Sequence, residues 1–514
     1  MHGSALSAAA WSRRIAQRFP DHDAIIDGTR RVTYAQLDQR VGRLAVALAG
    51  RGVAAGDRIA ALLVNGLPLV ELYLAAARLG AILLPLNWRL AGPELGWIID
   101  NAEPRILFAS DSLAALATVA TQHVPIIIVA EQPDATNAAD AYDALIASAD
   151  EDVHPGDDPA PELPWIMLYT SGTTGRPKGC LLSQQGQVIS ALAMASQWQS
   201  DEHTRLLLSL PLFHVGGTGL LFAHLTVGAT IIIAPRQFNA EAARRMASEL
   251  RCTALGVVPQ FYPDMIAAQK SDPLPLTLQL VTMGGGMHAP ELVAEVRAIL
   301  GAEPILGYGQ TEAGNYIAYI KGAEQLRHPK ACGRPLPQFD VRVVDSDDNP
   351  LPIGAVGELC VRGPSVLNAY WRNPEATETA LRGGWLHTGD LVQLDAHGLI
   401  TMMGRSKELI KTGGENVYPK EVEAVLFEHP AIADCVVFGV PHEYWGEAVK
   451  VMIALHPGQS LDARGVVDWV RARIAGYKRP RYVEFVATLP RTDTGKLLTR
   501  ELQARPLTVD QVVE

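Results

Sequence analysis

The residues best suited to chemistry lie in one glycine-rich stretch, residues 169–179, which reads YTSGTTGRPKG. Its glycines let the backbone turn sharply and bring N–H groups close to an anion, while hydroxyls and a lysine add donors. The residues that would bind a phosphate group are Thr170, Ser171, Gly172, Thr173, Thr174, Gly175 and Lys178. The spacing differs from a Walker loop, because no Gly-Lys-Ser/Thr ends the stretch. A solvated linker is the alternative, and the apolar, strand-like run at 165–168 argues against it.

Two further glycine-framed loops follow predicted strands. The MGGG run at 283–286 would let a flat ligand lie on Gly284, Gly285 and Gly286 with no side chain in the way. The run GYGQTEAG at 307–314 offers Tyr308 to stack on a base. Its Glu312 suits a magnesium ion that keeps most of its water. In this loop alone, a solvated turn glutamate would be the simpler interpretation of Glu312.

Three single residues complete the candidate chemistry. His214, in PLFHVGGTG, stands at a strand end where its ring would line a pocket, although a satisfied core histidine is the alternative. Asp390, in HTGD, would accept hydrogen bonds from a ribose diol, and Arg405 would donate to the same group. Lys496 follows Thr494 and Gly495 in the final loop, where an exposed turn lysine is an equally common feature.

Composition limits the class of protein. A chain of 514 residues suggests two or three domains. The net charge of −11 argues against a nucleic-acid binder. Five scattered cysteines lack metal-ligand spacing, which favours a reducing, cytoplasmic location without disulfides. The longest apolar stretch, 66–88, is interrupted by Glu71 and Arg78, so we expect no membrane span. Residues 5–19 suggest an amphipathic helix, with a transit peptide as a weaker alternative.

The elements that must position these residues form an α/β pattern. A helix begins at Thr33, with Gln36 as its capping-box partner. Strand 58–64, helix 67–79 and strand 81–84 form a βαβ unit, so we expect a parallel sheet. Alternation continues through helix 94–101 and strands 105–109 and 124–129, the last expected to be fully buried. We interpret 134–164 as a surface crossing.

Further short strands are predicted at 205–210, 229–234, 254–258, 278–282 and 304–306. The segments 339–345, 357–362 and 398–403 look antiparallel and predict a small β-barrel or a distorted sheet. Helix and strand at 421–440, a helix at 461–474 and an extended segment at 482–485 predict a compact α+β unit over about the last hundred residues.

Taken together, YTSGTTGRPKG, GYGQTE, HTGD, GRSKELIKTGGEN and PRTDTGK resemble the adenylate-forming superfamily over residues 33–502. This superfamily includes acyl- and aryl-CoA synthetases, peptide-synthetase adenylation domains and firefly luciferase. The resemblance implies that ATP and a carboxylate form acyl-AMP and pyrophosphate, after which a thiol displaces AMP. It therefore implies ATP, Mg2+ and coenzyme A as ligands and a small-molecule carboxylic acid as substrate.

The resemblance also implies residue roles. Lys178, His214, Glu312 and Lys496 would be catalytic, with Lys496 bridging the carboxylate and the α-phosphate. The nucleotide would contact the residues of the phosphate loop, the glycines of MGGG, and Tyr308, Gly309, Gln310, Thr311, Asp390, Arg405 and Lys496. Magnesium would be held by Glu312 and Thr174. The acyl pocket would include His214, Gly216, Gly309 and Asn315, and coenzyme A would contact Gly413, Gly414, Trp445, Tyr477 and Arg479.

A large N-terminal domain, 1–406, and a mobile C-terminal domain, 407–514, follow from the same resemblance, with Lys407 as hinge. The chain departs from the family at Gln184, where a histidine is frequent. The pocket glycines favour an aromatic, phenylpropenoid or medium-to-long-chain acid over acetate. Loading of a separate carrier protein is an alternative, luciferase-like oxidation another, and a nucleotide-binding sensor a non-enzymatic one. A homodimer is a further expectation.

Overall fold

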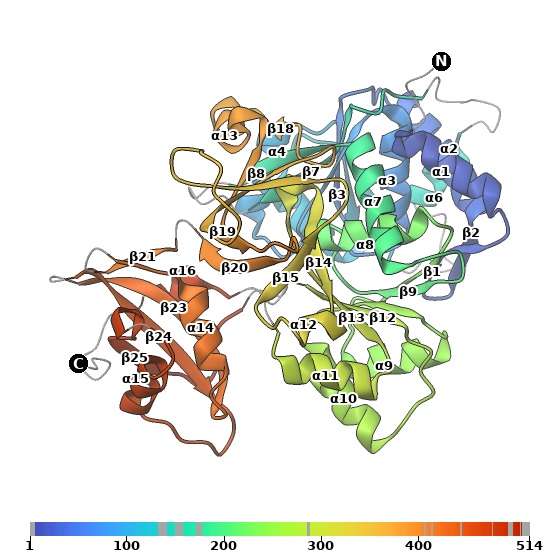
Figure 1. Ribbon diagram of the computed structural model, residues 1–514. Coiled ribbons are helices and arrows are strands. Elements are labelled where there is room, and N and C mark those ends of the chain that lie inside the picture. Colours follow the sequence, from blue (N-terminus) through green and yellow to red (C-terminus); the bar gives the residue numbers. More distant parts are fainter. Residues whose placement is uncertain are drawn as a thin grey trace.

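The computed structural model describes residues 6–131, 141–149, 158–170, 177–284, 288–405, 408–412, 415–442, 445–474, 476–491, 497–503 and 505. They form three β-sheets covered by helices (Figure 1). The chain is α/β, as the sequence predicts. Within this described part, no helix is long and apolar enough to cross a membrane.

The first sheet has 13 strands and changes character along its length. The strands β13, β12, β11, β9, β10 and β1 run parallel, and β2 closes that edge antiparallel. On the other side of β13 the strands β14, β15, β20, β19, β17 and β16 are antiparallel. The bounds are β1 (Asp23–Asp27), β2 (Arg30–Thr33), β9 (Arg205–Leu208), β10 (Thr230–Ile233), β11 (Ala254–Gly256), β12 (Leu280–Gly284), β13 (Glu303–Gln310), β14 (Asn315–Lys321), β15 (Ala331–Pro335), β16 (Asp340–Val344), β17 (Val356–Arg362), β19 (Leu386–Leu394) and β20 (Ile400–Arg405).

The expected small barrel takes the form of this antiparallel half. Its strand order is open in the described residues, with β16 at the edge, so the distorted-sheet alternative describes it better. The antiparallel pairing predicted for the segments around 339–345, 357–362 and 398–403 is confirmed.

The second sheet has seven strands in the order β18-β8-β7-β4-β3-β5-β6. The predicted βαβ unit is confirmed, since β3 and β4 are parallel and joined by α3, whose bounds agree with the prediction. The bounds are β3 (Arg58–Leu62), β4 (Ile82–Pro85), β5 (Ile106–Ser110), β6 (Ile126–Val129), β7 (Pro164–Thr170), β8 (Lys178–Ser183) and β18 (Ala369–Tyr370).

One large core joins the inner faces of these two sheets through α1, α2, α3, α7 and α8. The helix α2 shows why the sequence folds so: Thr33 and Gln36 form the predicted capping box, and Leu37, Val41 and Leu44 are buried on one face. The outer face of the first sheet is covered by α9, α10 and α11, and that of the second by α4 and α5. The bounds are α1 (Ala8–Arg18), α2 (Tyr34–Gly50), α3 (Leu67–Leu79), α4 (Gly92–Ala102), α5 (Ala114–Ala120), α6 (Ala141–Ala147), α7 (Gln184–Trp198), α8 (Val215–Leu225), α9 (Ala240–Glu249), α10 (Phe261–Ser271), α11 (Pro290–Ile299), α12 (Gly322–Gln325) and α13 (Pro374–Ala380).

Two expectations about this region are wrong. The strand at 126–129 is the edge strand β6, and Ile128 is 37% exposed, because an apolar run does not reveal whether both flanks are paired. The segment 134–164 is more than a surface crossing, because α6 buries Tyr142, Leu145 and Ile146. Their i, i+3, i+4 spacing was a helix signal that the acidic surroundings obscured.

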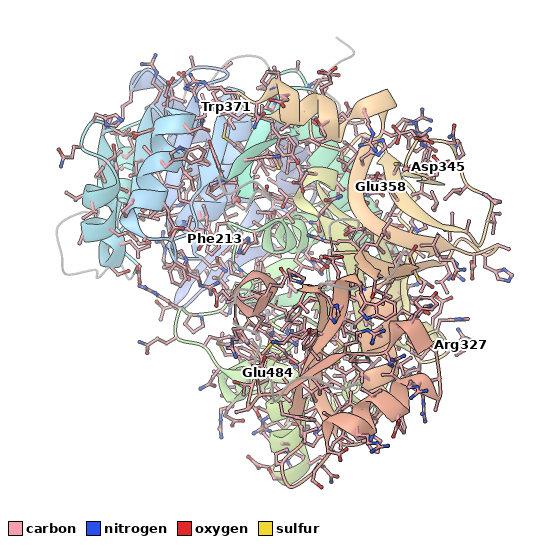
Figure 2. All side chains as sticks on the ribbon, turned by 90° about the vertical axis from the view of Figure 1, so that its left-hand side faces the viewer. Phe213, Arg327, Asp345, Glu358, Trp371 and Glu484 are labelled. Atoms are coloured by element: carbon pink, nitrogen blue, oxygen red, sulfur yellow. The ribbon has the colours of Figure 1, made fainter. Side chains whose placement is uncertain are left out.

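The C-terminal elements form a separate sheet of five strands with its own core (Figure 1). The predicted helix–strand succession of this unit is confirmed. Figure 2 looks onto it, with Glu484 toward the viewer. The bounds are β21 (Ile410–Thr412), β22 (Glu415–Val417), α14 (Pro419–Phe427), β23 (Ile432–His442), β24 (Gly446–Leu455), α15 (Ala463–Arg471), β25 (Tyr482–Phe485) and α16 (Thr499–Gln503). The boundary after residue 406 stays a prediction, because 406–407 lie outside the described residues.

Candidate active site

The glycine-rich stretch connects two paired strands. β7 and β8 are antiparallel, and Thr170 faces Lys178 across the pair. The strand before it is buried from Trp165 to Leu168, as expected. Of the predicted phosphate ligands, only Thr170 and Lys178 are described; Ser171, Gly172, Thr173, Thr174 and Gly175 lie outside the described residues. The register nevertheless fixes where the stretch leaves and rejoins the sheet.

Three residues predicted to bind the nucleotide meet in one hydrogen-bonded group. Asp390 and Arg405 are cross-strand partners in β19 and β20, and Arg405 Nε donates to Asp390 Oδ1 over 3.0 Å. Tyr308, from β13, donates its hydroxyl to Asp390 Oδ2 over 2.6 Å. Asp390 is only 3% exposed. Burial, together with this carboxylate, raises the pKa of Tyr308 well above its ordinary value, so the hydroxyl stays a donor.

Among the described residues, each oxygen of the Asp390 carboxylate has one hydrogen-bond partner, and a carboxylate oxygen can accept two hydrogen bonds. The group therefore keeps capacity for a diol while being held in a fixed orientation. Gln310, at the end of β13, adds a buried side-chain amide nitrogen that has no hydrogen-bond partner among the described residues. A buried donor of this kind fits a site that binds a ligand with several acceptors.

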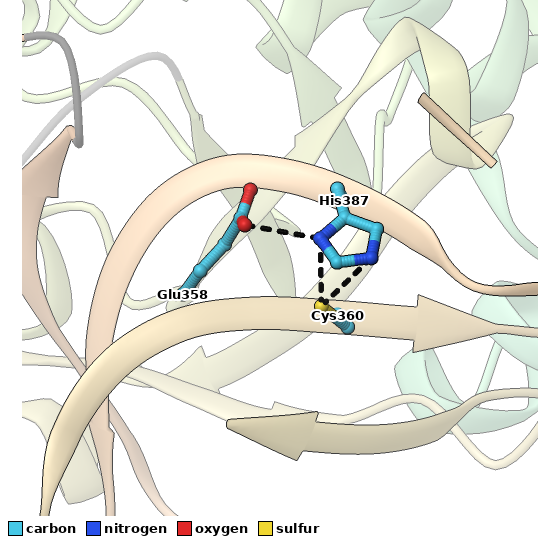
Figure 3. Close-up of side chains that lie close together, drawn as sticks. All are labelled: Glu358, Cys360 and His387. Carbon is cyan, nitrogen blue, oxygen red and sulfur yellow. Dashed lines mark hydrogen bonds and ion pairs between the residues drawn. The ribbon is translucent and has the colours of Figure 1, made fainter. Parts of the chain in front are cut away.

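A second group of side chains involves the HTGD segment of β19 (Figure 3). Gly389 adopts a φ of 73°, which favours glycine, and its N–H donates to Glu358 Oε1 over 2.9 Å. Glu358 Oε2 lies 3.0 Å from His387 Nδ1, and Cys360 Sγ lies 3.3 Å from the same nitrogen. Glu358, Cys360 and His387 offer ligand-type atoms within 4.8 Å of one another.

These three atoms already have partners. Arg382 Nη2 lies 3.2 Å from Glu358 Oε2 and compensates its charge. Burial, followed by the Glu358 charge, raises the pKa of Cys360 to about 12, so the thiol is protonated. We therefore assign the group a structural role: it holds the part of β19 immediately before Asp390. Sequence analysis missed Glu358, whose only signal was its place two residues before Cys360 on one strand face.

A third group surrounds Glu312. Tyr370, the last residue of β18, donates its hydroxyl to Glu312 Oε1 over 2.9 Å. Lys178 Nζ lies 5.1 Å from the centre of the same tyrosine ring. Three segments distant in sequence thus bring Lys178 and Glu312 to one side chain. Tyr370 was not predicted, because its place depends on the pairing of β18 with β8.

The predicted acyl pocket lies at the start of α8. His214 is the N-cap residue of α8, and Asn315 Nδ2 donates to the Val215 carbonyl over 2.9 Å. A side chain added at Gly216 would meet nothing within 4 Å, so this glycine borders open space. Burial, with Arg89 contributing, lowers the pKa of His214 to about 4, so the ring is neutral near pH 7.

The other glycines of this region serve the fold as well. At Gly309 an added Cβ would lie 2.1 Å from the Asn315 carbonyl oxygen, and at Gly284 it would lie 3.1 Å from the Tyr316 hydroxyl. Glycine is thus required at 309 by the neighbouring strand β14, independently of a ligand. Gly285 and Gly286 lie outside the described residues.

Among the predicted coenzyme A contacts, Trp445, Tyr477 and Arg479 are described. The guanidinium of Arg481 lies 4.3 Å from the Trp445 ring centre, a contact that the sequence did not indicate. Tyr477 is 39% exposed. Gly413, Gly414, Lys407 and Lys496 lie outside the described residues, so their roles stay predictions.

Comparison with known proteins agrees with this geometry. The family model described as "AMP-binding enzyme" matches residues 12–371, and "AMP-binding enzyme C-terminal domain" matches 421–496. The chain belongs to this family of adenylate-forming enzymes, as the motifs predict.

Particular relatives match nearly the whole chain. The chain is similar to an indoleacetate–CoA ligase of Aromatoleum aromaticum, with 36% identity covering 98% of this chain and 100% of the relative. It is similar to a feruloyl-CoA synthase of Amycolatopsis, with 33% identity covering 96% and 98%. Among solved structures, ATP-bound MatB from Rhodopseudomonas palustris superposes with a TM-score of 0.86 at 30% identity, covering 97% of this chain and 98% of that one.

Proposed function

We propose that the protein is an ATP-dependent carboxylic acid–CoA ligase that works through an acyl-adenylate. In the first step a carboxylate oxygen attacks the α-phosphorus of ATP and pyrophosphate leaves. In the second step the thiol of coenzyme A attacks the acyl carbon, the acyl–oxygen bond breaks, and AMP leaves. The Tyr308–Asp390–Arg405 group carries the proposal, because two donors hold the buried Asp390 carboxylate in place and it would accept hydrogen bonds from a ribose diol.

The proposed residue roles follow from charge. Attack of a carboxylate on a phosphate brings two anions together, so cations must offset their repulsion. Lys178 stands at the end of the phosphate stretch and would contact the β- and γ-phosphates. Lys496 would bridge the carboxylate and the α-phosphate, a role that rests on its motif alone.

Magnesium fits the donor chemistry of the Glu312 loop. Glu312 presents a carboxylate just after β13, and Mg2+ prefers oxygen ligands, keeping several waters. Glu312 and the Thr174 hydroxyl would hold the ion, which when bound would neutralise charge on the phosphates. Glu312 Oε1 accepts a hydrogen bond from the Tyr370 hydroxyl.

An aromatic acid is the proposed substrate class. The relatives named above are ligases for an indole acid and a phenylpropenoid acid, and the open space at Gly216 together with a neutral His214 suits an uncharged ring. A medium-to-long alkyl acid stays an alternative within the same reaction. A homodimer and a cytoplasmic location also stay predictions; light scattering of the purified protein checks the first.

Pyrophosphate release tests the reaction. Aryl and alkyl acids, each with ATP and Mg2+, are offered with coenzyme A, with a pantetheinylated carrier protein or with neither. We expect acid-dependent release and acyl-CoA formation with at least one aryl acid. Thioester formed only on the carrier would favour the carrier-loading alternative. A protein that binds ATP but releases no pyrophosphate with any acid would be a nucleotide sensor instead.

Lys496→Ala separates the two half-reactions. We expect it to lower the rate of acyl-AMP formation by about 10²–10³ or more, because a preorganised charge is lost where negative charge accumulates. Thiolysis of preformed acyl-AMP should be spared. Both are measured in single turnovers, and equal loss of the two would exclude the proposed role of Lys496.

A further inference from the structure

A short segment, residues 365–371, connects the hairpin of β7 and β8 with the loop that carries Glu312. On one side, β18 pairs with β8, the Asn368 N–H donates to the Leu181 carbonyl over 2.8 Å, and the Trp371 N–H donates to the Gly179 carbonyl over 2.7 Å. On the other side, the Leu367 N–H donates to the Glu312 carbonyl over 2.8 Å. The segment therefore holds the backbones of both the strand after the predicted phosphate-binding stretch and the loop with the predicted magnesium ligand Glu312.

Tyr370 extends this link to the side chains. Its hydroxyl donates to Glu312 Oε1 over 2.9 Å, and its ring faces Lys178 Nζ at 5.1 Å from the ring centre. A tyrosine hydroxyl bonded to a carboxylate is a charge-assisted hydrogen bond, and an ammonium over a ring is a cation–π contact. Each contact fixes one of two oppositely charged groups, so they are held apart instead of forming an ion pair.

The environment keeps the tyrosine in this role. Tyr370 is 8% exposed, and its backbone N–H donates over 3.0 Å to the Oγ1 atom of Thr377, which lies in α13. Burial and this backbone hydrogen bond limit the positions that the Tyr370 side chain can take.

We propose that Tyr370 is a positioning residue for adenylation: its hydroxyl orients the Glu312 carboxylate toward the magnesium ion, and its ring holds the Lys178 ammonium toward the phosphates. This inference rests on the proposed function. The two contacts use different parts of one side chain, so two substitutions separate them. Tyr370→Phe removes the hydroxyl and keeps the ring, whereas Tyr370→Leu removes both.

Calorimetric titration with ATP, which requires no acid, tests the two contacts. We expect Tyr370→Phe to weaken ATP binding about tenfold in Mg2+ and to leave it unchanged in EDTA, because only the Glu312 contact is lost. We expect Tyr370→Leu to weaken binding in both conditions, because Lys178 is also released. Unchanged ATP binding by Tyr370→Leu, or equal weakening of Tyr370→Phe in Mg2+ and EDTA, would overturn the assignment.

Half-reactions give a second test. Tyr370→Phe should slow acyl-AMP formation about 10–100-fold while thiolysis of preformed acyl-AMP stays within twofold. The matched control is Tyr142→Phe, which removes the hydroxyl bonded to Glu71 Oε2 over 2.8 Å, far from the site. We expect this control to lower thermal stability and leave both half-reactions intact. If Tyr370→Phe slowed both half-reactions alike, the tyrosine would only support the fold. If the wild-type protein released no pyrophosphate, the ligase proposal would fail. The calorimetric titration would in that case still decide the role of Tyr370.

Discussion

The proposed nucleotide side and the proposed acid side of the site are built in different ways. Around Asp390, side chains from β13, β19 and β20 form hydrogen bonds with one another, and sheet register sets their positions. Around His214 and Gly216, the proposed acyl pocket combines open space beside a glycine with a neutral ring. The first arrangement depends on particular hydrogen-bonding side chains, whereas the second depends on the space left by a glycine. The proposed roles would let one nucleotide site serve relatives that act on different acids.

Asp390→Ala should have the largest effect on the nucleotide side. It leaves Arg405 and Tyr308 without their acceptor and removes the proposed ribose contact, so we expect kcat/KM for ATP to fall about 10²–10³-fold. Steady-state kinetics with varied ATP measures this. Asp340→Ala is the matched control, because Asp340 and Arg362 form the same cross-strand pair on β16 and β17 at 3.0 Å but are exposed. If both variants behaved alike, the Asp390 pair would be an ordinary sheet contact.

Gly216→Val should change which acid is used. Its side chain enters open space, so we expect kcat/KM to fall about 10–100-fold for a bicyclic aryl acid relative to benzoate, with ATP binding unchanged. A pyrophosphate-release comparison across acids measures the ratio. Gly217→Ala is the contrasting neighbour: its Cβ would lie 2.2 Å from the Pro211 carbonyl oxygen, so it should lower thermal stability instead. An unaltered acid profile for Gly216→Val would place the pocket elsewhere.

Glu358→Ala should weaken ATP use more modestly. It removes a carboxylate that accepts from the Gly389 N–H and so loosens the part of β19 before Asp390; we therefore expect the KM for ATP to rise about tenfold. Glu358→Gln keeps an acceptor at the same place and should recover most of the loss. Recovery distinguishes a positioning effect from general destabilisation, which would affect the KM for the acid equally.

The smallest expected effect is on stability at acid pH. Burial lowers the pKa of three histidines to about 4: His214, His224 and His288. An unfolded histidine titrates near 6.5, so the unfolded chain binds more protons between about pH 6.5 and 4. Stability should therefore fall as the pH decreases through that window, each group contributing up to about 1.4 kcal/mol per pH unit. Replacing His224, which is remote from the predicted contacts, by Gln should flatten the decline of the thermal midpoint; an unchanged slope would contradict this.

The sequence predicted the helices and strands better than it predicted the side-chain contacts of the candidate site. Residues 67–79 were predicted as a helix with the bounds that α3 has, because apolar spacing and flanking glycines are local signals. The joint role of Asp390 and Arg405 was inferred from motif chemistry, and the register of β19 and β20 confirms that the two are adjacent. A pair of this kind can be predicted from the sequence when both of its residues lie in recognisable motifs.

The missed residues share a different cause. Tyr370 and Glu358 lie outside the glycine-rich motifs and act through strands far away in sequence. Their importance follows from which residue faces which across a ladder, and a shift of one residue would point either side chain to the opposite face. No local pattern encodes that pairing. The edge position of β6 was missed for the same reason.

The position of Arg405 at the very end of β20 has a mechanical meaning. Should the chain swivel at Lys407, as its motif predicts, the pivot would stand two residues from the arginine that anchors Asp390. A residue close to a rotation axis moves little when a domain rotates about that axis. The ribose of the adenylate would accordingly keep its position while distant parts of the C-terminal unit move. The acyl-AMP intermediate would then stay bound between its formation and its reaction with the thiol.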